Sequence, residues 1–282
     1  MILSRNITIC GVIGYPVSHS LSPVLHNFWI KKYKQNGTYI PFAVDPTKLN
    51  EAIVGIINLG IKGVNVTLPH KESVLKYVQQ LTDNAKEIGA VNTLTLNKEG
   101  KIIGDNTDAF GFLANLKDFA PHLRFASQKA IILGAGGVAK SVCFALINSG
   151  ISEVIVVNRN KERAEKIKEK FGSNIRVEIW ENRDQALEDV SILINCTSLG
   201  MNGQPALEIS LEKLPPDAVV NDLVYTPINT RLLIEARKRG HISVDGLGML
   251  LHQAKPAFHS WFDIQPEVSI ELRNHVLASI NQ

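Results

Sequence analysis

Short apolar runs alternate with longer helix-like stretches throughout the second half of the 282-residue chain. Six runs rich in β-branched residues occur at 130–133, 153–157, 175–179, 191–195, 218–222 and 241–245. Strands that are apolar on both faces are typical of a parallel sheet that helices cover on both sides. The pattern therefore predicts a doubly wound α/β domain in this part of the chain.

The first hundred residues mix strand and helix patterns less regularly. Strands are predicted at 7–14, 39–44, 64–67, 92–97 and 101–104, the last two joined by a turn at 98–100. Pro41 belongs on an edge strand, because proline has no N–H for the interior of a sheet. Ser22 followed by Pro23 predicts a helix that ends near Lys34, with Ser22 as its cap. A second, smaller α/β domain is expected here.

Thr107 is a candidate cap for a helix from 108 to about 119, which would connect the two domains. After Asp245 the chain carries two amphipathic patterns, at 246–262 and 266–280, without a further strand pattern. We expect these helices to return to the first domain. The predicted organisation is a first domain at 1–107, a second at 108–246 and C-terminal helices at 247–282.

The composition is that of a globular protein, with 45% apolar and 20% charged residues, and excludes disordered, collagen-like and coiled-coil chains. Thirty Lys and Arg nearly balance 27 Asp and Glu, and no run of five like charges indicates a nucleic-acid partner. No apolar stretch reaches the roughly 18 residues of a membrane span. Arg5 and Asn6 interrupt the amino terminus, so no signal peptide is predicted. Cys10, Cys143 and Cys196 are expected to be buried free thiols in the cytoplasm, and no metal site is expected.

A glycine-rich segment follows the predicted strand at 130–133. It matches the pattern G-x-G-x-x-(G/A) and consists of Gly134, Ala135, Gly136, Gly137, Val138 and Ala139. In a strand-loop-helix context these glycines make a tight turn and let the backbone approach a pyrophosphate at the helix start. The segment predicts a dinucleotide site.

The end of the next predicted strand bears on the choice of dinucleotide. An NAD site usually places a carboxylate there for the ribose hydroxyl, but this chain has Asn158, Arg159 and Asn160, with Arg163 four positions after Arg159. Two guanidinium groups at a helix start can clamp a 2′-phosphate. The alternative is that both arginines are ordinary solvated charges. The pattern favours NADP over NAD.

Polar residues gather where apolar segments of the first domain end, at 18–23, 65–67, 69–72, 92–93 and 106–108. Such positions form the rim of a cleft, which we expect between the two domains. From the residues alone, Ser22 is equally well explained as a helix cap, Asn65 and Thr67 as a strand-end turn, and Lys71 as a solvated charge. The Tyr-x-x-x-Lys pair of short-chain reductases and a Cys/His set for zinc are both missing.

Eight segments together resemble the shikimate dehydrogenase family over nearly the whole chain, at 14–27, 63–72, 88–94, 104–112, 134–140, 195–201, 222–227 and 245–253. The resemblance implies reversible NADP-dependent reduction of 3-dehydroshikimate to shikimate, in aromatic amino-acid (chorismate) biosynthesis. It implies a substrate domain and a Rossmann-type NADP domain. Two departures are Lys140, where many relatives have arginine, and Asp263, where glycine is frequent.

The resemblance also implies the functional residues. Lys71 would be the proton donor and acceptor, oriented by Asp108, which would also bind a substrate hydroxyl. Substrate contacts are implied at Ser20, Ser22, Asn65, Thr67, Asn92 and Gln253. Cofactor contacts are implied at the glycine segment, at 158–160 and Arg163, and at Thr197, Leu223, Tyr225, Gly246 and Met249. No motif gives chemistry to His19, His70 or His252, which are expected to be structural.

Two other functions fit parts of the pattern. A quinate/shikimate dehydrogenase using NAD belongs to the same family, but Arg159, Arg163 and the lack of an acid at Asn158 argue against it. A catalytically silent NADPH-binding regulator would be expected to lack Lys71 or Asp108, and both are present. We expect a small-molecule enzyme that is a monomer or a homodimer.

Overall fold

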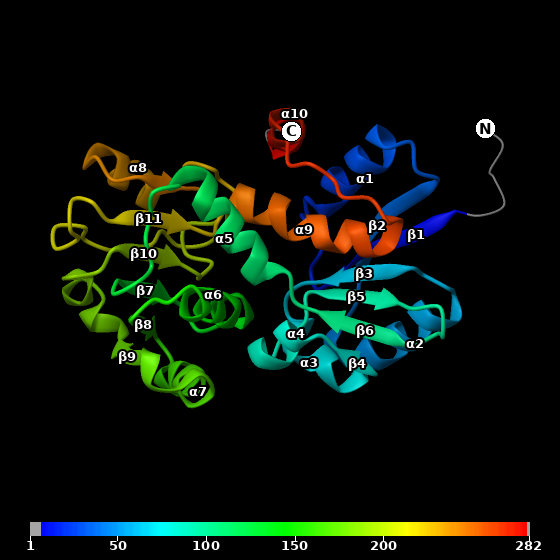
Figure 1. Ribbon diagram of the computed structural model, residues 1–282, viewed down its shortest axis with the longest axis horizontal. Helices are drawn as coiled ribbons and strands as arrows, with labels where there is room; N and C mark the ends of the chain where they lie inside the picture. Colours follow the sequence, from blue (N-terminus) through cyan, green and yellow to red (C-terminus); the bar gives the residue numbers. More distant parts are fainter. Residues whose placement is uncertain (1–6, 281–282) are drawn as a thin grey trace. The chain divides into compact units, whose positions relative to one another are not determined.

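The computed structural model describes residues 7–280, which form two compact α/β units (Figure 1). One unit contains the described residues up to Thr107 together with those from Gln253 onward, and the other contains Asp108–His252. Arg5 and Asn6, on which the expectation about a signal peptide rests, lie outside the described residues. The chain thus passes from the first unit to the second after Thr107. It returns to the first unit after His252, inside a C-terminal helix.

The first unit has a mixed six-stranded sheet. Its strand order is β2 (Gly37–Ala43), β1 (Thr8–Gly14), β3 (Gly63–Val66), β5 (Thr93–Leu96), β6 (Ile102–Asp105) and β4 (Gln80–Leu81). Strands β2, β1 and β3 are parallel, whereas β5 is antiparallel to both β3 and β6. Pro41 lies on the edge strand β2, as predicted, and residues 98–100 connect the predicted β5–β6 hairpin.

The helices of the first unit are α1 (Ser22–Lys32), α2 (Leu49–Asn58), α3 (His70–Ser73), α4 (Asp83–Ile88) and α10 (Ile270–Ile280), with short 3-10 helices at Pro46–Lys48 and Val74–Tyr77. The prediction that Ser22 caps α1 is wrong. Leu21 occupies the cap position without a side-chain bond, and Ser22 is the first helical residue, with its side chain buried. Its backbone N–H donates instead to Ser20 Oγ at 3.3 Å. The buried side chain of Ser22 thus lies inside the helix, although serine usually prefers the cap position.

An aromatic cluster fastens the C-terminal segment to the first unit. His26 and Trp29 of α1 and Tyr39 of β2 pack against Phe258 and Trp261 of α9 (Gly246–Phe262). The indole N–H of Trp261 donates to the Leu94 carbonyl at 3.2 Å, which ties α9 to β5. Burial of several large rings in one place supplies much of the apolar contact that holds these distant segments together.

The second unit contains a parallel six-stranded sheet. Its order is β12 (Ser243–Val244), β11 (Val219–Asp222), β10 (Ile192–Asn195), β7 (Lys129–Leu133), β8 (Glu153–Asn158) and β9 (Ile175–Ile179). The first strand in sequence, β7, lies at the centre, and the chain proceeds outward first to β9 and then to β12 (Figure 1). This order is that of a doubly wound dinucleotide-binding sheet, and it confirms the predicted fold class.

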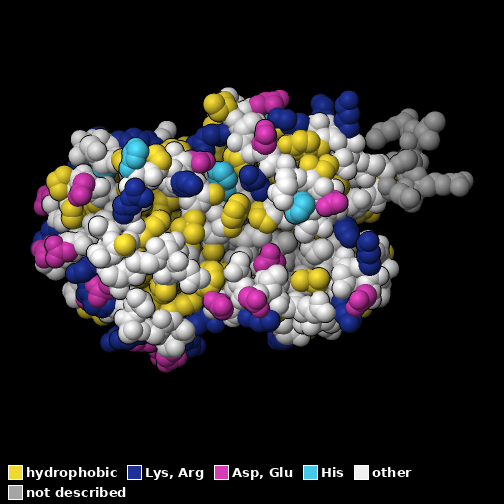
Figure 2. Space-filling model, in the orientation of Figure 1, with side chains coloured by type: hydrophobic (Ala, Val, Ile, Leu, Met, Phe, Trp, Pro, Cys, Tyr) yellow, Lys and Arg dark blue, Asp and Glu magenta, His cyan; other side chains and the backbone are white. Residues whose placement is uncertain are grey.

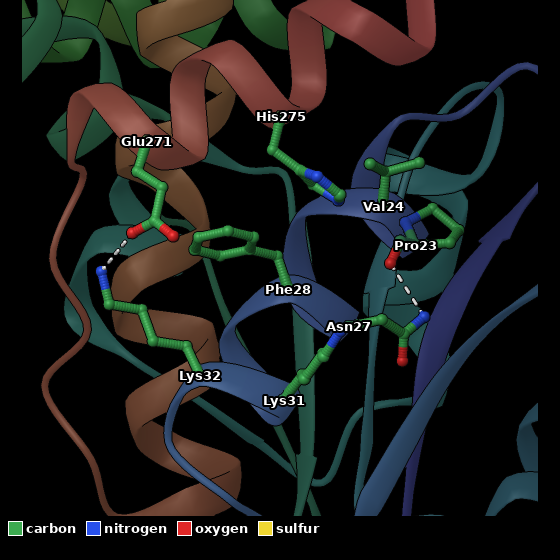
Figure 3. Close-up of a pocket in the computed structure, with 8 residues that line it drawn as sticks. All are labelled: Pro23, Val24, Asn27, Phe28, Lys31, Lys32, Glu271 and His275. Carbon is green, nitrogen blue, oxygen red and sulfur yellow. Dashed lines mark hydrogen bonds and ion pairs between the residues drawn. The ribbon is translucent and has the colours of Figure 1, made fainter.

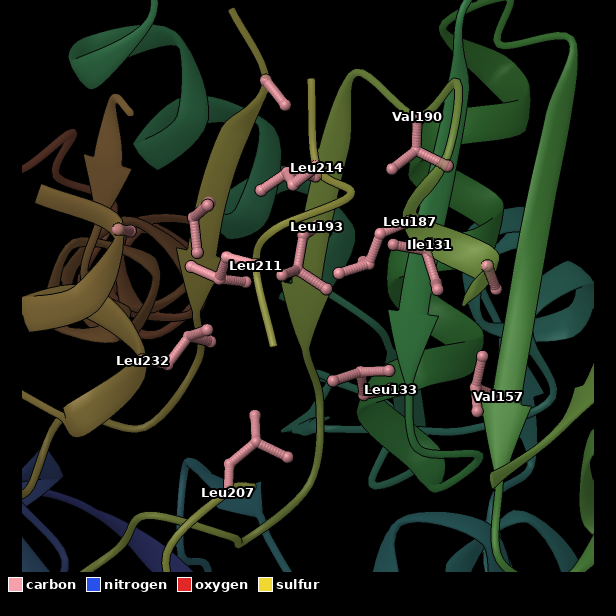
Figure 4. Close-up of a cluster of buried hydrophobic side chains, with 14 of the residues drawn as sticks. Ile131, Leu133, Val157, Leu187, Val190, Leu193, Leu207, Leu211, Leu214 and Leu232 are labelled. Atoms are coloured by element: carbon pink, nitrogen blue, oxygen red, sulfur yellow. The ribbon is translucent and has the colours of Figure 1, made fainter. Parts of the chain in front are cut away.

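The helices of the second unit are α5 (Asp108–Phe119), α6 (Gly137–Asn148), α7 (Lys161–Phe171) and α8 (Arg231–Lys238), with 3-10 helices at Gly172–Asn174, Trp180–Asn182 and Gln185–Leu187. Figure 4 shows the apolar core against one face of the sheet, where Ile131, Leu193 and Val157 meet leucines from the loops and from α8. Because these strand residues are fully buried, they form apolar runs from which the strands could be predicted in the sequence.

The first turns of α9 belong to the second unit. Asn115 Nδ2 of α5 donates to the Asp245 carbonyl at 2.7 Å, and His252 Nε2 lies 2.8 Å from Asp118 Oδ2. A Cβ at Gly248 would overlap the Asn115 side chain, so glycine permits the close approach of α9 to α5. The division between the two compact units therefore lies within α9, between His252 and Gln253.

The surface charges, the helices and the cysteines bear on the expectations from composition. On the face shown in Figure 2, lysine and arginine side chains are interspersed with aspartate and glutamate. Within residues 7–280, no helix combines the length and the apolar character that a membrane crossing requires. The three cysteines are free thiols; Cys10 and Cys143 are buried as expected, but Cys196 is partly exposed.

Candidate active site

Three predicted substrate residues of the first unit belong to one buried hydrogen-bond network. Asn65 of β3 accepts a hydrogen bond from the Tyr39 hydroxyl on Oδ1, with an O···O distance of 2.7 Å. Its Nδ2 donates to the Asn92 carbonyl at 3.2 Å and to Thr93 Oγ1 at 3.1 Å. All four residues are buried. The site is thus held by neutral groups that orient one another.

Asn92 joins this network to the start of α5 and to α9. Its Oδ1 accepts the Thr107 backbone N–H at 2.9 Å, and its Nδ2 donates to Thr107 Oγ1 at 2.9 Å and to Gln253 Oε1 at 3.2 Å. From the sequence, Thr107 was predicted as a helix cap and as part of the polar segment at 106–108. The structure makes it a central partner of Asn92, and Gln253 reaches the same point from 161 positions away.

The two candidate serines lie beside this network but in different environments. Ser20 is half-buried, and its Oγ accepts the backbone N–H of Ser22. Ser22 is buried, and its hydroxyl forms a hydrogen bond with the Tyr39 phenol. Ser20 therefore offers a hydroxyl at the edge of the unit, whereas Ser22 also contributes to its interior.

Lys71 is positioned by a tight connection between β3 and α3. Thr67 follows the strand directly; its N–H donates to the Ile13 carbonyl at 2.9 Å and its carbonyl accepts the His70 N–H at 2.9 Å. Lys71 is the second residue of α3 and is half-buried, and its carbonyl accepts the Val91 N–H at 2.8 Å. Backbone bonds on both sides thus fix where its side chain starts.

Asp108 is the first residue of α5 in the second unit and is almost fully buried. Aspartate side chains are seldom fully buried, and a buried acid is a common feature of functional sites. Of the histidines, His70 is buried with Nε2 at 2.7 Å from the Val44 carbonyl, and His252 pairs with Asp118. Both contacts are structural.

The glycine segment of the second unit has the shape of a dinucleotide loop. Gly134 follows β7 with φ at +108°, and a Cβ there would lie 3.1 Å from the Cys196 backbone. Gly136 occupies the cap position of α6, and a Cβ there would meet no atom within 4 Å. No side chain within residues 7–280 caps α6, so its first N–H groups can serve an anion. Ala139 is fully buried, as close packing of this helix requires.

The segment after β8 separates two roles among the predicted cofactor residues. Asn158 Nδ2 donates to the Asn160 carbonyl at 2.8 Å, and Asn160 Oδ1 caps α7 by accepting the Arg163 N–H at 3.1 Å. The asparagine side chains thus build the turn. Arg159 and Arg163 are exposed, so their guanidinium groups remain accessible to a phosphate.

The remaining predicted cofactor residues surround the ends of β10 and β11. Thr197 Oγ1 donates to Asn195 Oδ1 at 2.7 Å, and a Cβ at Gly246 would overlap the Leu223 carbonyl. Tyr225 is half-buried and burial raises its pKa, while Met249 is buried. These residues follow the ends of the neighbouring parallel strands β10, β11 and β12, where doubly wound sheets bind ligands.

Asp222 was missed as a residue that organises this region. Its Oδ1 accepts from Asn195 Nδ2 at 2.9 Å and from the Val224 N–H at 3.0 Å, and its Oδ2 accepts the Thr230 hydroxyl at 2.7 Å. Burial raises the pKa of Asp222 to about 6, although these three bonds act in the opposite direction. An acid at the end of an apolar strand was the available sequence signal. Within residues 7–280 no group of His, Cys, Asp and Glu side chains is arranged to hold a metal ion.

Comparisons with known proteins agree with this geometry. Residues 12–94 match the family described as shikimate dehydrogenase substrate binding domain, and residues 116–202 match shikimate / quinate 5-dehydrogenase. The NADP⁺ shikimate dehydrogenase of Cereibacter sphaeroides is 47% identical over 97% of this chain and 98% of its own length. The chain belongs to the shikimate dehydrogenase family.

Two solved structures of this family differ in what they bind. Shikimate dehydrogenase from Thermus thermophilus, in complex with NADP(H) and shikimate, is 34% identical with a TM-score of 0.83, covering 97% of this chain and 98% of that one. Quinate dehydrogenase from Corynebacterium glutamicum, in complex with NAD, is 27% identical with a TM-score of 0.88, covering 97% and 100%. The fold is thus shared by shikimate and quinate dehydrogenases, and identity is higher to the former.

One departure from the family pattern has a structural meaning. Asp263 adopts a φ of +56°, in the left-handed region that favours glycine, just after α9 ends. Its N–H donates to the His259 carbonyl at 2.8 Å, which closes the helix. The glycine that the family resemblance leads us to expect at this position would adopt the same backbone without strain, and aspartate tolerates it at some cost in strain.

A separate hollow of about 830 Å³ lies between α1 and α10 of the first unit (Figure 3). Phe28, Val24 and Pro23 form its apolar wall, and Lys32 pairs with Glu271 across it at 3.1 Å. Its lining residues include none of the predicted site residues. The hollow is therefore distinct from the candidate site.

Proposed function

We propose that this protein is an NADP-dependent shikimate dehydrogenase, which reversibly reduces 3-dehydroshikimate to shikimate in aromatic amino-acid biosynthesis. The observation that carries the proposal is the buried neutral network of Asn65, Asn92 and Gln253 next to the fixed start of Lys71. The 47% identity to a shikimate dehydrogenase over almost the whole chain supports it.

The chemistry of the network suits this substrate. Shikimate carries one carboxylate and three hydroxyls, and amide and hydroxyl side chains can each donate and accept hydrogen bonds. Asn65, Thr67, Asn92 and Gln253 serve the ring hydroxyls in this proposal, and Ser20 and Ser22 hold the carboxylate. Because the buried groups are already ordered by each other, binding costs little side-chain entropy.

Lys71 and Asp108 carry the proton chemistry in this proposal. Bound NADPH supplies a hydride to the carbonyl carbon of 3-dehydroshikimate. Lys71 donates a proton from Nζ to the carbonyl oxygen as negative charge develops there, and it recovers a proton from the hydroxyl in the oxidation direction. Asp108 binds a substrate hydroxyl and orients the Lys71 ammonium group.

The predicted domain at 108–246, which lies within the second unit, binds the dinucleotide. The turn at Gly134, the open position at Gly136 and the uncapped start of α6 fit a pyrophosphate. Arg159 and Arg163 hold the 2′-phosphate. Thr197, Leu223, Tyr225, Gly246 and Met249 line the nicotinamide end. Residues 1–107 and the C-terminal helices bind the substrate.

The protein acts on a small molecule without a nucleic-acid partner, as a monomer or a homodimer, in the cytoplasm. The near balance of charge and the free cysteines support this setting. These statements are independent of the catalytic assignment.

The experiment compares four reactions of the purified protein, with shikimate or quinate and with NADP⁺ or NAD⁺. We expect the highest kcat/KM for shikimate with NADP⁺. A higher kcat/KM for quinate with NAD⁺ would instead favour the second candidate function, to which the quinate dehydrogenase structure gives weight. No turnover in any pair, with NADPH still bound, would favour a silent regulator.

A further inference from the structure

The orientation of the Asn65 side-chain amide is fixed by its neighbours. The Asn92 carbonyl can only accept hydrogen bonds, so the Asn65 atom 3.2 Å from it must be the nitrogen. The amide oxygen consequently faces the Tyr39 hydroxyl at 2.7 Å. The chemistry of these partners leaves one arrangement of the amide.

The second hydrogen of Asn65 Nδ2 is also committed. Thr93 Oγ1 lies 3.1 Å from Nδ2, and the Thr93 hydroxyl donates its own proton to Asn92 Oδ1 at 3.0 Å. Asn92 Oδ1 is in turn the acceptor of the Thr107 N–H. The Thr93 oxygen must therefore accept from Asn65. Both amide hydrogens are used inside the protein, and the hydrogen-bonding capacity that Asn65 can offer a ligand lies on its oxygen.

Tyr39 is built to hold that oxygen in place. It is 1% exposed, and its phenol donates to Asn65 from the opposite side to Asn92 and Thr93. Its ring stacks on the His26 ring with centroids 4.2 Å apart and planes 4° from parallel. This ring contact holds the two side chains together, and the His26 ring also interacts with the side chain of Asn65. A rigid ring aims the hydroxyl.

We propose that Tyr39 is a positioning residue that holds Asn65 as a hydrogen-bond acceptor for one hydroxyl of the substrate. This inference rests on the proposed function, because that function places a polyhydroxylated ring against Asn65. Tyr39 does not touch the reacting atoms in this proposal. Tyr39 determines that Asn65 acts as an acceptor in the site, and this in turn determines which pattern of substrate hydroxyls can bind.

The test uses Tyr39→Phe, which removes the hydroxyl and keeps the ring that stacks on His26. We expect KM for shikimate to rise about fivefold or more, because the variant loses the bond to Asn65 and the bond to Ser22, with kcat changed less and KM for NADP⁺ unchanged. Tyr33→Phe is the matched control. Tyr33 belongs to the same unit and its hydroxyl accepts the Glu267 N–H at 3.1 Å, away from Asn65; its KM for shikimate should stay unchanged.

Three shikimate analogues, each lacking one ring hydroxyl, separate positioning from general support of the fold. Their inhibition constants are compared between the unmodified protein and Tyr39→Phe. We expect the analogue that lacks the hydroxyl accepted by Asn65 to lose much less affinity than the other two, because only the loss through Ser22 beside the carboxylate is common to all three. Equal weakening of all three, or of none, overturns the proposal.

Thr93→Val keeps the test decisive if Tyr39→Phe does not fold. Valine preserves the shape of threonine and removes the acceptor of the second Asn65 hydrogen. The same single analogue should be insensitive to this change, and sensitivity to all three analogues would contradict the proposal. Turnover of shikimate by the unmodified protein reports the proposed function separately, so failure of one idea is distinguishable from failure of the other.

Discussion

The two units build their candidate sites by different means. In the first, buried side chains such as Asn65, Asn92 and Tyr39 hold one another through neutral hydrogen bonds. In the second, glycine backbone and the exposed Arg159 and Arg163 form most of the candidate site. A side-chain network recognises a particular pattern of hydroxyls, whereas backbone and surface charge recognise phosphate groups. Substitutions should therefore have different consequences in the two units.

Each unit also buries a histidine or an aspartate whose pKa is displaced by burial, and the two displacements have opposite consequences in acid. His26 of the first unit is enclosed by Trp29, Tyr39, Phe258 and Trp261 without a charged neighbour among them, and burial lowers its pKa from 6.5 to about 3. Burial raises the pKa of Asp222 in the second unit from 3.8 to about 6. Acid should therefore lower the stability of the first unit and raise that of the second.

The largest expected effect is the loss of stability of the first unit in acid. Below pH 6.5 the unfolded chain protonates His26 but the folded unit does not, so the unfolded state binds more protons. The stabilisation is complete above pH 6.5 and is lost as pH falls toward 3, by roughly 5 kcal/mol in total at about 1.4 kcal/mol per pH unit. For Asp222 the folded state binds the proton more tightly, so acidification from pH 6 to 3.8 favours the folded second unit by up to roughly 3 kcal/mol.

Amide hydrogen exchange, converted to free energies of opening at pH 7 and pH 4.5, measures this difference region by region. The strands of the first unit should open more easily at pH 4.5, and those of the second should not. His26→Phe should reduce the pH dependence in the first unit only, and Asp222→Asn should alter it in the second only. Equal acid sensitivity of both units would contradict the comparison.

The next effect concerns catalysis. Lys71→Ala should lower kcat for shikimate by about 100-fold or more, because a positioned acid-base group is lost, while the thermal midpoint and NADPH binding stay unchanged. Lys76→Ala is the control, since Lys76 is an exposed lysine nearby that packs over Tyr77. Steady-state kinetics and fluorescence titration with NADPH give the two readouts.

Asp108→Asn tests whether the two catalytic residues act together. Alone it should also lower kcat. If Asp108 works through Lys71, the double variant loses less than the product of the single losses. Multiplicative losses would show independent roles, and near-normal turnover of Lys71→Ala would remove that residue from the mechanism.

A smaller effect is expected at the exposed arginines of the second unit. Arg159→Ala should raise KM for NADP⁺ about tenfold and spare NAD⁺, because charge-assisted bonds to the 2′-phosphate are lost. Asn158→Asp combined with Arg159→Ala should shift preference further toward NAD⁺. Lys166→Ala, which removes one exposed charge elsewhere on α7, controls for net charge. Added salt should weaken binding of NADP⁺ more than of NAD⁺, and an Arg159→Ala variant that keeps its NADP⁺ preference would contradict the assignment.

How much was predictable also differs between the units. Strands β7, β8, β10 and β11 of the second unit were predicted because each is a short run buried on both faces, which leaves a clear apolar signal. Strand β4 was missed because neither of its two residues, Gln80 and Leu81, is fully buried, so it leaves no apolar run. The role of Ser22 was misread because its preference for caps is local, whereas its burial beside Tyr39 is a tertiary effect.

The candidate site shows the same limit. The glycine segment and Lys71 lie in contiguous motifs that can be recognised in a sequence. The roles of Tyr39 and Thr107 cannot be recognised in this way, although Thr107 lies in the family-like segment 104–112, because each role is a hydrogen bond to a residue 26 or 15 positions away. Nothing in a strand pattern distinguishes a tyrosine that packs from one that also orients an amide. Hydrogen-bond networks of this kind become visible only when the fold brings their members together.

The smallest expected effect distinguishes the two serines of the first unit. Ser20→Ala should raise KM for shikimate a few-fold with little change in kcat, because a carboxylate contact is the same in ground and transition states. Its thermal midpoint should stay unchanged, since Ser20 is half-buried and its bond to the Ser22 N–H is long. Ser22→Ala should raise KM similarly and also lower stability by about 1 kcal/mol, because the buried bond to the Tyr39 hydroxyl is lost.

Ser18→Ala, at an exposed position in the same loop, is the control. Thermal melts and substrate kinetics of the three variants measure both quantities. A loss of stability for Ser22→Ala with unchanged KM would leave Ser22 a structural residue, and an unchanged KM for both serines would place the carboxylate elsewhere.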